Sequence, residues 1–154
     1  MKIKELDKRP NIDQDKKLTA AYAYFETLII ELKKKEIPSE IINSINRDIQ
    51  DLNSFSGTNN DLLKQLKKRQ SGIFKLLEKE LKLVPKNLYR NRWLVIGMSV
   101  FGIPFGVIFG ISLGNMAFLG IGIPLGMVVG IAIGTGMDKK AFEEGKQLDI
   151  EVKL

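Results

Sequence analysis

The sequence predicts an all-α membrane protein, in which a two-helix glycine-zipper transmembrane hairpin follows a cytoplasmic domain of amphipathic helices. Two observations predict this class. No charged residue occurs between Trp93 and Met137, and this stretch is dominated by aliphatic residues, phenylalanine and glycine. About 20 such residues cross a bilayer as one helix, so the stretch is long enough for two spans and a turn. Before it, apolar residues recur at the three- and four-residue spacing of amphipathic helices.

The distribution of charge divides the chain into four segments. Residues 1–14 are predicted to be a flexible charged N-terminus, 15–83 a cytoplasmic helical domain, 84–137 the transmembrane hairpin and 138–154 a cytoplasmic tail. The net charge of +6 is uneven, because residues 61–92 hold ten basic side chains against three acidic ones. This excess predicts contact with a bilayer that has anionic head groups. Nucleic acid is not expected as a partner, because no aromatic platform for stacking bases accompanies the charge.

The cytoplasmic domain is predicted to contain three helices. They are expected at about 15–35, 38–52 and 61–83, with Pro38 separating the first two and a polar loop at 54–60 before the third. Their apolar stripes can bury one another, or one stripe can be reserved for a partner or for the bilayer surface. We therefore expect a protein partner to bind through these helices.

The segment that joins this domain to the apolar stretch is typical of a membrane entry. Tyrosine and tryptophan side chains favour the membrane–water interface, and arginine side chains remain at the level of the lipid head groups. The residues expected to touch lipid head groups are Lys82, Lys86, Arg90, Arg92, Trp93, Lys139 and Lys140. Basic residues precede the first span and follow the second, so the positive-inside rule places both termini of this multi-pass protein in the cytoplasm.

Within the hairpin, the spans are expected at 93–113 and 116–136, with Gly114 and Asn115 forming the turn. After the second span, Gly145 is expected to end a short helical continuation. The final residues Leu148, Ile150, Val152 and Leu154 alternate with polar ones, as the residues of a strand would.

An internal repeat is the most specific feature of the hairpin. Residues 102–114 and 122–134 match at seven of thirteen positions, and each copy carries a glycine at every fourth residue. Close packing drives the association of helices in hydrocarbon, and a row of glycines lets two backbones approach. The residues expected to pack the helices are Gly102, Gly106, Gly110, Gly114, Gly122, Gly126, Gly130, Gly134, Pro104 and Pro124.

Folding the spans about the turn predicts a register. Gly106 is expected opposite Pro124, and Gly126 opposite Pro104, so that each glycine makes room for a proline kink. The two glycine rows either satisfy each other within one hairpin or also join subunits into a homo-oligomer. The sequence leaves both arrangements open.

The glycine rows and the ending from Met137 to Gly145 resemble the glycine-zipper membrane segments of many small bacterial proteins. The resemblance covers about residues 93–146 and implies membrane packing, a bacterial source and oligomers. It implies no activity, since such segments occur in channels and pore-formers as well as in anchors.

The residues that enzymes and transporters require are missing. The chain has no histidine and no cysteine, and no cluster of carboxylates has metal-binding or acid–base spacing, so we expect no enzyme, no metal and no cofactor. The spans lack ionisable groups, which disfavours a transporter. The leading hypothesis is a non-enzymatic, membrane-anchored interaction or scaffold protein of a bacterial inner membrane. The alternatives are an oligomeric pore-forming or membrane-disrupting effector, and an immunity protein against a membrane-active toxin.

Overall fold

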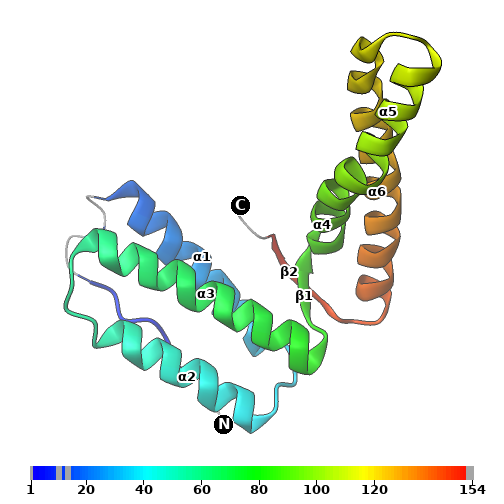
Figure 1. Ribbon diagram of the computed structural model, residues 1–154. Helices are drawn as coiled ribbons and strands as arrows, with labels where there is room; N and C mark the ends of the chain where they lie inside the picture. The colour runs from blue at the N-terminus through cyan, green and yellow to red at the C-terminus, as the bar shows by residue number, and fades with distance from the viewer. Residues whose placement is uncertain (1, 10–11, 13–14, 152–154) are drawn as a thin grey trace. The chain divides into compact units, whose positions relative to one another are not determined.

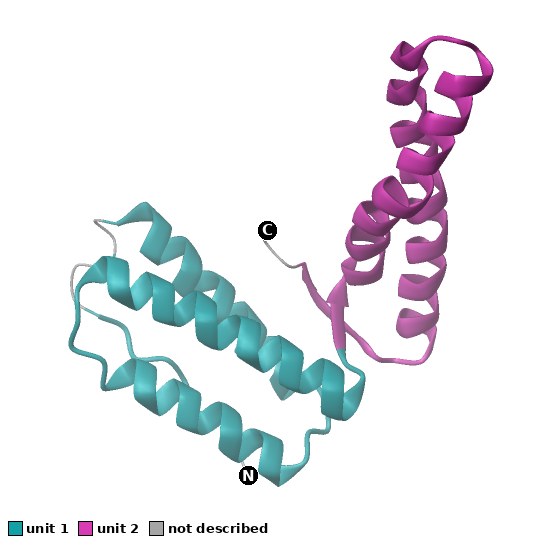
Figure 2. Ribbon diagram, in the orientation of Figure 1, with its two compact units in different colours: residues 1–83 teal, residues 84–154 magenta. Residues whose placement is uncertain are grey.

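The computed structural model describes residues 2–9, 12 and 15–151. The chain divides between Leu83 and Val84 into two compact units, coloured teal and magenta in Figure 2. The predicted boundary between the helical domain, 15–83, and the hairpin, 84–137, lies at the same position. Val152 and Leu154, which were included in the alternating pattern at the end of the chain, lie outside the described residues.

Unit 1 consists of three helices and the chain that precedes them (Figure 1). The helices are α1 (Lys16–Lys33), α2 (Ser39–Asn53) and α3 (Asn59–Leu81), at the three predicted places and with ends that differ by about two residues. Asp15 caps α1 by accepting hydrogen bonds from the backbone N–H groups of Lys17 and Leu18. Thr58 caps α3 in the same way, through the N–H of Asp61.

The core of unit 1 lies where α1 and α2 pack on α3, while direct contact between α1 and α2 is sparse. Each helix contributes a stripe of fully buried side chains, which include Phe25, Leu28, Ile45, Ile49, Leu62, Leu66, Ile73 and Leu77. Burying a side chain of this size contributes about 1.5–3 kcal/mol. The stripes therefore hold α1 and α2 against α3, more than against each other.

An extended segment from the predicted flexible N-terminus binds α2 and α1. Residues 2–9, which we call the strap, run beside α2 and bury the side chains of Ile3 and Leu6. Two asparagines of α2 bind the main chain of the strap. The many charged residues of this segment indicated a solvated tail. Its two aliphatic residues, Ile3 and Leu6, are nevertheless buried, and two residues three apart are too few to form a recognisable periodic pattern. Residues 2–9 are thus seated on unit 1 in the structure, and the flexibility of residues 1–14 stays a prediction.

The two asparagines bind equivalent points of the strap. The side chain of Asn46 accepts a hydrogen bond from the N–H of Lys4 at 2.7 Å and donates to the carbonyl of Lys2 at 3.1 Å. Asn53 repeats the pattern, since it accepts from the N–H of Asp7 at 3.0 Å and donates to the carbonyl of Glu5 at 3.3 Å. Seven helical residues advance by about 10.5 Å and three extended residues by about 10 Å, so helix and strap stay in step.

Glu5 and Arg9 of the strap also interact with α1. Lys33 forms an ion pair with Glu5 at 2.7 Å, and its hydrogen bond and charge lower the pKa of Glu5 below the ordinary value. This attraction is present at neutral pH and is lost as the pH falls through that lowered pKa. Arg9 donates to the carbonyls of Leu52 and Phe55 at the C-terminus of α2, where a cation is favoured. Burial raises the pKa of Tyr22 on α1, and the nearby guanidinium of Arg9 opposes that rise.

Unit 2 is a helical hairpin with a strand at each end. Its first arm comprises α4 (Leu88–Gly97), a π-helical turn η2 (Met98–Gly102) and α5 (Ile103–Ser112). The second arm comprises a 3₁₀ turn η3 (Met116–Phe118) and α6 (Leu119–Glu143). Gly114 and Gly145 have left-handed backbones, with φ of 66° and 69°, and each ends a helix as the sequence predicted.

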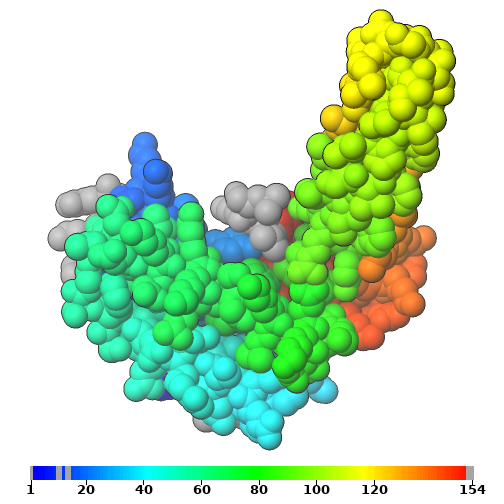
Figure 3. Space-filling view, in the orientation of Figure 1, coloured from blue at the N-terminus to red at the C-terminus, as the bar shows by residue number. Residues whose placement is uncertain are grey.

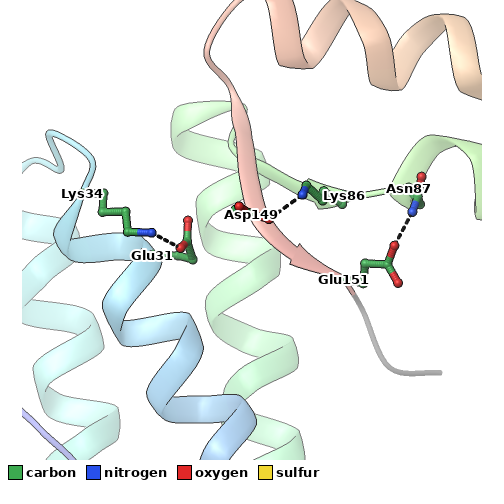
Figure 4. A network of polar contacts seen from close by, with 6 residues as sticks. All are labelled: Glu31, Lys34, Lys86, Asn87, Asp149 and Glu151. Atoms are coloured by element: carbon green, nitrogen blue, oxygen red, sulfur yellow. Dashed lines mark hydrogen bonds and ion pairs between the residues drawn. The ribbon is translucent and has the colours of Figure 1, made fainter.

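Unit 2 also contains two short β-strands, so the fold is mostly but not entirely α-helical. β1 (Val84–Lys86) pairs in parallel with β2 (Gln147–Glu151), and Pro85 lies opposite Leu148. The second strand falls on the predicted alternation, but its partner was interpreted only as a membrane entry. The hairpin brings the two segments together, and Gly145 turns the chain back after α6, so that β2 runs parallel to β1. Figure 4 shows the ion pair between Lys86 and Asp149 and the hydrogen bond between Asn87 and Glu151 that join these segments.

We predict that Asn46→Ala destabilises unit 1 by about 1–3 kcal/mol, because it leaves two main-chain groups of the strap without their partner. Gln50→Ala is the matched control, since Gln50 lies on the same helix and binds only the exposed ammonium of Lys4 at 3.0 Å. The measurement is chemical denaturation of the two variants in detergent, followed by circular dichroism. Equal losses of stability in the two variants would contradict the proposed role of the asparagine pair.

Candidate membrane-spanning hairpin

The two arms of the hairpin approach each other so closely that their contacting residues are almost all glycines. The buried glycines are Gly97, Gly102, Gly106 and Gly110 on the first arm and Gly122, Gly126, Gly130 and Gly134 on the second. A methyl group added at Gly106 would lie 2.6 Å from the carbonyl oxygen of Leu119, and one added at Gly134 would lie 2.5 Å from the Cα of Arg90. These obstacles are backbone atoms, so no side chain can move aside to make room.

The observed register differs from the predicted one. Gly106 lies against Leu119 and Gly122 instead of Pro124, and Gly126 lies against Gly97 and Gly102 instead of Pro104. The predicted pairs were therefore wrong by about one helical turn. The reason is that the chain reverses direction before Gly114 and Asn115, the two residues about which the prediction folded the spans. Asn115 already caps the second arm by accepting from the N–H of Ala117 at 2.9 Å, so that Met116 lies beside Gly110.

Three residues predicted to pack the helices lie elsewhere. Pro104 and Pro124 are exposed on the outer faces of the two arms and touch no glycine of the opposite arm. Gly114 has open space around it and serves as the left-handed residue of the turn. The phase of a helix explains the prolines, because each follows a contact glycine by two residues and so points about 160° away from the contact face.

Gly97 is a packing residue that sequence reasoning missed. It precedes Gly102 by five residues instead of four, which in a regular α-helix would rotate it away from the contact face. The π-helical turn at 98–102 accommodates one extra residue and brings Gly97 back to α6, where an added methyl would lie 2.8 Å from the Cα of Gly130. This turn directly precedes Pro104, whose ring clashes with a regular helical carbonyl at Val100. Pro104 is therefore the feature of the sequence from which an irregular turn at this position could have been predicted.

Asp138 continues the glycine row and was also missed. It follows Gly134 by four residues and is only 7% exposed. Its carboxylate accepts hydrogen bonds from the N–H groups of Tyr89 at 3.1 Å and Arg90 at 2.9 Å. These donors belong to the first turn of α4, whose own cap residue Asn87 makes no side-chain capping bond. A carboxylate at a helix N-terminus is favoured by the helix dipole, so Asp138 fastens the two arms at the base of the hairpin.

The outer faces of the arms are apolar and exposed. Leu88–Ser112 and Met116–Glu143 are long and apolar enough to span a membrane, yet only 22% and 17% of their most apolar windows is buried. Large side chains that point outward include Val95, Val100, Ile108, Ile111, Leu113, Met116, Ile121 and Val128. Figure 3 shows one face of the hairpin, on which side chains of α4 and α5 form a continuous surface. A soluble monomer rarely exposes an apolar surface of this extent.

The basic residues of unit 2 gather at the base of the hairpin, away from the turn. Gly134 packs on the backbone of Arg90, and Lys139 and Lys140 follow Asp138 on α6. Arg92 and Trp93 follow Arg90 by two and three residues on α4, and Lys86 precedes this helix on β1. Lys82 instead ends α3 in unit 1, with a left-handed backbone. Lys139 and Lys140 pair with Glu143 and Glu144 at 3.8 and 3.9 Å, and both lysine side chains remain more than 70% exposed.

Few other groups in the hairpin offer chemistry. Ser99 donates to the carbonyl of Val95 in its own helix at 3.1 Å, which satisfies its hydroxyl. No group of three metal-ligating side chains occurs in the part of the chain that the structure describes. The chain matches no protein-family model, no curated protein and no solved structure. Its function must therefore be argued from the hairpin and unit 1 alone.

We predict that Gly122→Ala lowers the thermal stability of the hairpin, because its methyl group would lie 2.6 Å from the Cα of Gly106. Gly120→Ala, two residues earlier on the same helix, meets no atom within 4 Å and should be neutral or stabilising by up to about 1 kcal/mol. Thermal unfolding of both variants in the same detergent checks this. A Gly122→Ala protein as stable as the Gly120→Ala protein would contradict the observed contact face.

We predict that Asp138→Ala costs about 1–3 kcal/mol, because two N–H groups of α4 lose their acceptor. Asp138→Asn should cost less, since the amide oxygen still accepts one bond. Glu143→Ala is the control, because its ion pair with Lys139 is long and exposed. Unfolding of the three variants by sodium dodecyl sulfate in mixed micelles provides the comparison, and a loss for Glu143→Ala equal to that for Asp138→Ala would count against the cap.

Proposed function

We propose that this chain is a non-enzymatic interaction or scaffold protein, anchored in a bacterial inner membrane by its glycine-zipper hairpin. The single observation that carries the proposal is the outward-facing apolar surface of two arms that are long enough to span a bilayer. A core helix of a soluble protein passes the same test of length and hydropathy, but such a helix is mostly buried. Here the glycine faces are buried and the large apolar side chains are exposed, which suits lipid as the surrounding solvent.

The dimensions of the hairpin support a full crossing. The uncharged part of the first arm, 93–112, has a helical length of about 30 Å, which equals the hydrocarbon thickness of a typical bilayer. The turn at 113–115 carries no charge and needs to emerge only slightly on the far side. Because all charged groups of unit 2 lie at the base, both termini belong on the same side. The positive-inside rule assigns that side to the cytoplasm.

The basic residues at the base suit contact with anionic head groups. Arg90, Arg92, Lys139 and Lys140 lie within two turns of the ends of the arms, as does the interfacial Trp93. Acidic neighbours offset part of this charge, but exposed ion pairs are weak and leave the lysines available to phosphate groups. Lys82 and Lys86 are assigned to the same contact.

Unit 1 is the part that we assign to a protein partner. Its helices share a buried core, and no group of three metal-ligating side chains occurs among the described residues. The glycine rows motivated the pore-forming alternative, and their close packing within one hairpin gives that alternative less support than the anchor. No observation on the described chain favours the immunity alternative.

We predict that a single cysteine at Asn115 is labelled by an impermeant maleimide from the periplasmic side of intact cells, and one at Lys67 only after lysis. The chain has no cysteine of its own, so each label reports one position. The protein should also remain in the membrane pellet after alkaline carbonate treatment. Release by carbonate would contradict membrane anchoring, and labelling of both positions from the same side would contradict the crossing.

A further inference from the structure

The helix α3 carries an excess of positive charge on one side. It holds six basic and three acidic side chains, whereas α2 holds one basic and three acidic. Four exposed lysines, which we call the basic stripe, follow one another at intervals of four, seven and four residues: Lys64, Lys68, Lys75 and Lys79. At about 100° per residue they lie within about 60° of one another around the helix axis. They face away from the side of α3 that is buried against α1 and α2.

Acidic neighbours neutralise the basic stripe only weakly. Lys64 lies 3.8 Å from Asp61 and Lys79 lies 3.3 Å from Glu80, yet the two lysine side chains are 79% and 81% exposed. Exposed ion pairs of this kind are weak and are screened by salt. The third acidic residue of the helix, Glu78, lies about 70° to one side of the centre of the stripe. The stripe therefore presents a net positive surface to its surroundings.

The middle of the basic stripe has only small side chains. Ser71 and Gly72 lie between Lys68 and Lys75, which are about 10 Å apart along the helix axis. A glycine inside a helix is destabilising relative to alanine, and a methyl group added at Gly72 would meet no atom within 4 Å. Packing among the described residues therefore does not require this glycine. Its absence of a side chain lets a surface outside the protein approach the helix closely between the two lysines.

The chain keeps the basic stripe close to the membrane anchor. α3 ends at Leu81 and α4 begins at Leu88, so seven residues limit the distance between these two helix ends to about 25 Å. A short tether to a membrane anchor gives the stripe a high effective concentration of lipid head groups. Lys82 and Lys86, which are assigned to head-group contact, lie within this tether. Basic residues thus continue along the chain from the stripe to the base of the hairpin.

We propose that α3 lies along the cytoplasmic surface of the bilayer, with its basic stripe on anionic phospholipid head groups. Each lysine near an anionic surface adds to the attraction, and the stripe brings four of them to one side. The proposal rests on the proposed function, because the hairpin supplies the tether. α1 and α2 pack on the opposite side of α3, so their exposed faces remain available to a protein partner.

The test places a fluorescent label on the basic stripe of the full-length protein through Ser71→Cys, at an exposed and uncharged position. The protein is reconstituted in vesicles that contain lipids with a nitroxide on the head group, which quenches fluorescence only at short range. We expect quenching at residue 71 to be at least about twofold stronger with about 30% phosphatidylglycerol than in phosphatidylcholine alone. It should fall in about 1 M salt, where the Debye length is about 3 Å. A label introduced by Asn43→Cys, on the exposed face of α2, should be quenched weakly in both vesicles.

Two pairs of charge substitutions test the lysines themselves. Lys68→Gln with Lys75→Gln should reduce the quenching at residue 71 in anionic vesicles to the level found in phosphatidylcholine alone. Lys16→Gln with Lys17→Gln removes the same charge from exposed positions of α1 and should leave the quenching unchanged. Circular dichroism checks that both variants keep the helix content of the parent protein.

Equal quenching at residues 43 and 71 would overturn the proposal, since the tether alone would then bring unit 1 to the surface. Quenching that does not depend on phosphatidylglycerol, or that survives the loss of Lys68 and Lys75, would also overturn it. Carbonate washing of the same vesicles tests anchoring separately. A protein that is quenched at residue 71 but released by carbonate would contradict the proposed function alone, and one that is retained but not quenched would contradict the α3 contact alone.

Discussion

The close approach of α6 to the first arm is the constraint on which the rest of unit 2 depends. Two backbones can come this near only if the contact residues lack a Cβ atom, which is why both contact faces are built of glycine. Placing glycine inside leaves the large apolar side chains on the outside, the reverse of the arrangement in a soluble core. The same geometry brings the ends of the arms together, where Asp138 caps α4 and the two strands pair.

Unit 1 depends on a second kind of constraint, the match in length between a helix and an extended chain. Asn46 and Asn53 lie seven residues apart on α2 and bind main-chain groups that lie three residues apart in the strap. Each asparagine side chain offers one hydrogen-bond acceptor group and one donor group. The two side chains can therefore pair with N–H and carbonyl groups of the strap, as a neighbouring strand would in a sheet. This ladder holds the strap against α2, where two of its aliphatic side chains are buried.

The features that repeat regularly were predictable from the sequence. Helical periodicity located α1, α2 and α3, and the uncharged stretch located both arms. The register was not predictable, because it depends on where Asn115 starts the second arm and on a π-helical turn that shifts the phase before Pro104. Asp138 was missed although it continues the four-residue spacing of the glycines, because its charge placed it outside the apolar stretch. The strap was missed because an extended chain bound through asparagine side chains has no periodic signature of its own.

The most direct test of the account is whether the outer face of the hairpin contacts lipid. Spin labels attached at Ile111 and Val128, which are 67% and 66% exposed, should collide frequently with oxygen and rarely with a polar nickel reagent when the protein is in liposomes. A label at Lys67 on α3 should show the opposite preference. Labels at Ile111 and Val128 that are accessible to neither reagent would show that protein covers this face, and they would contradict the assignment of the hairpin as a lipid-facing anchor.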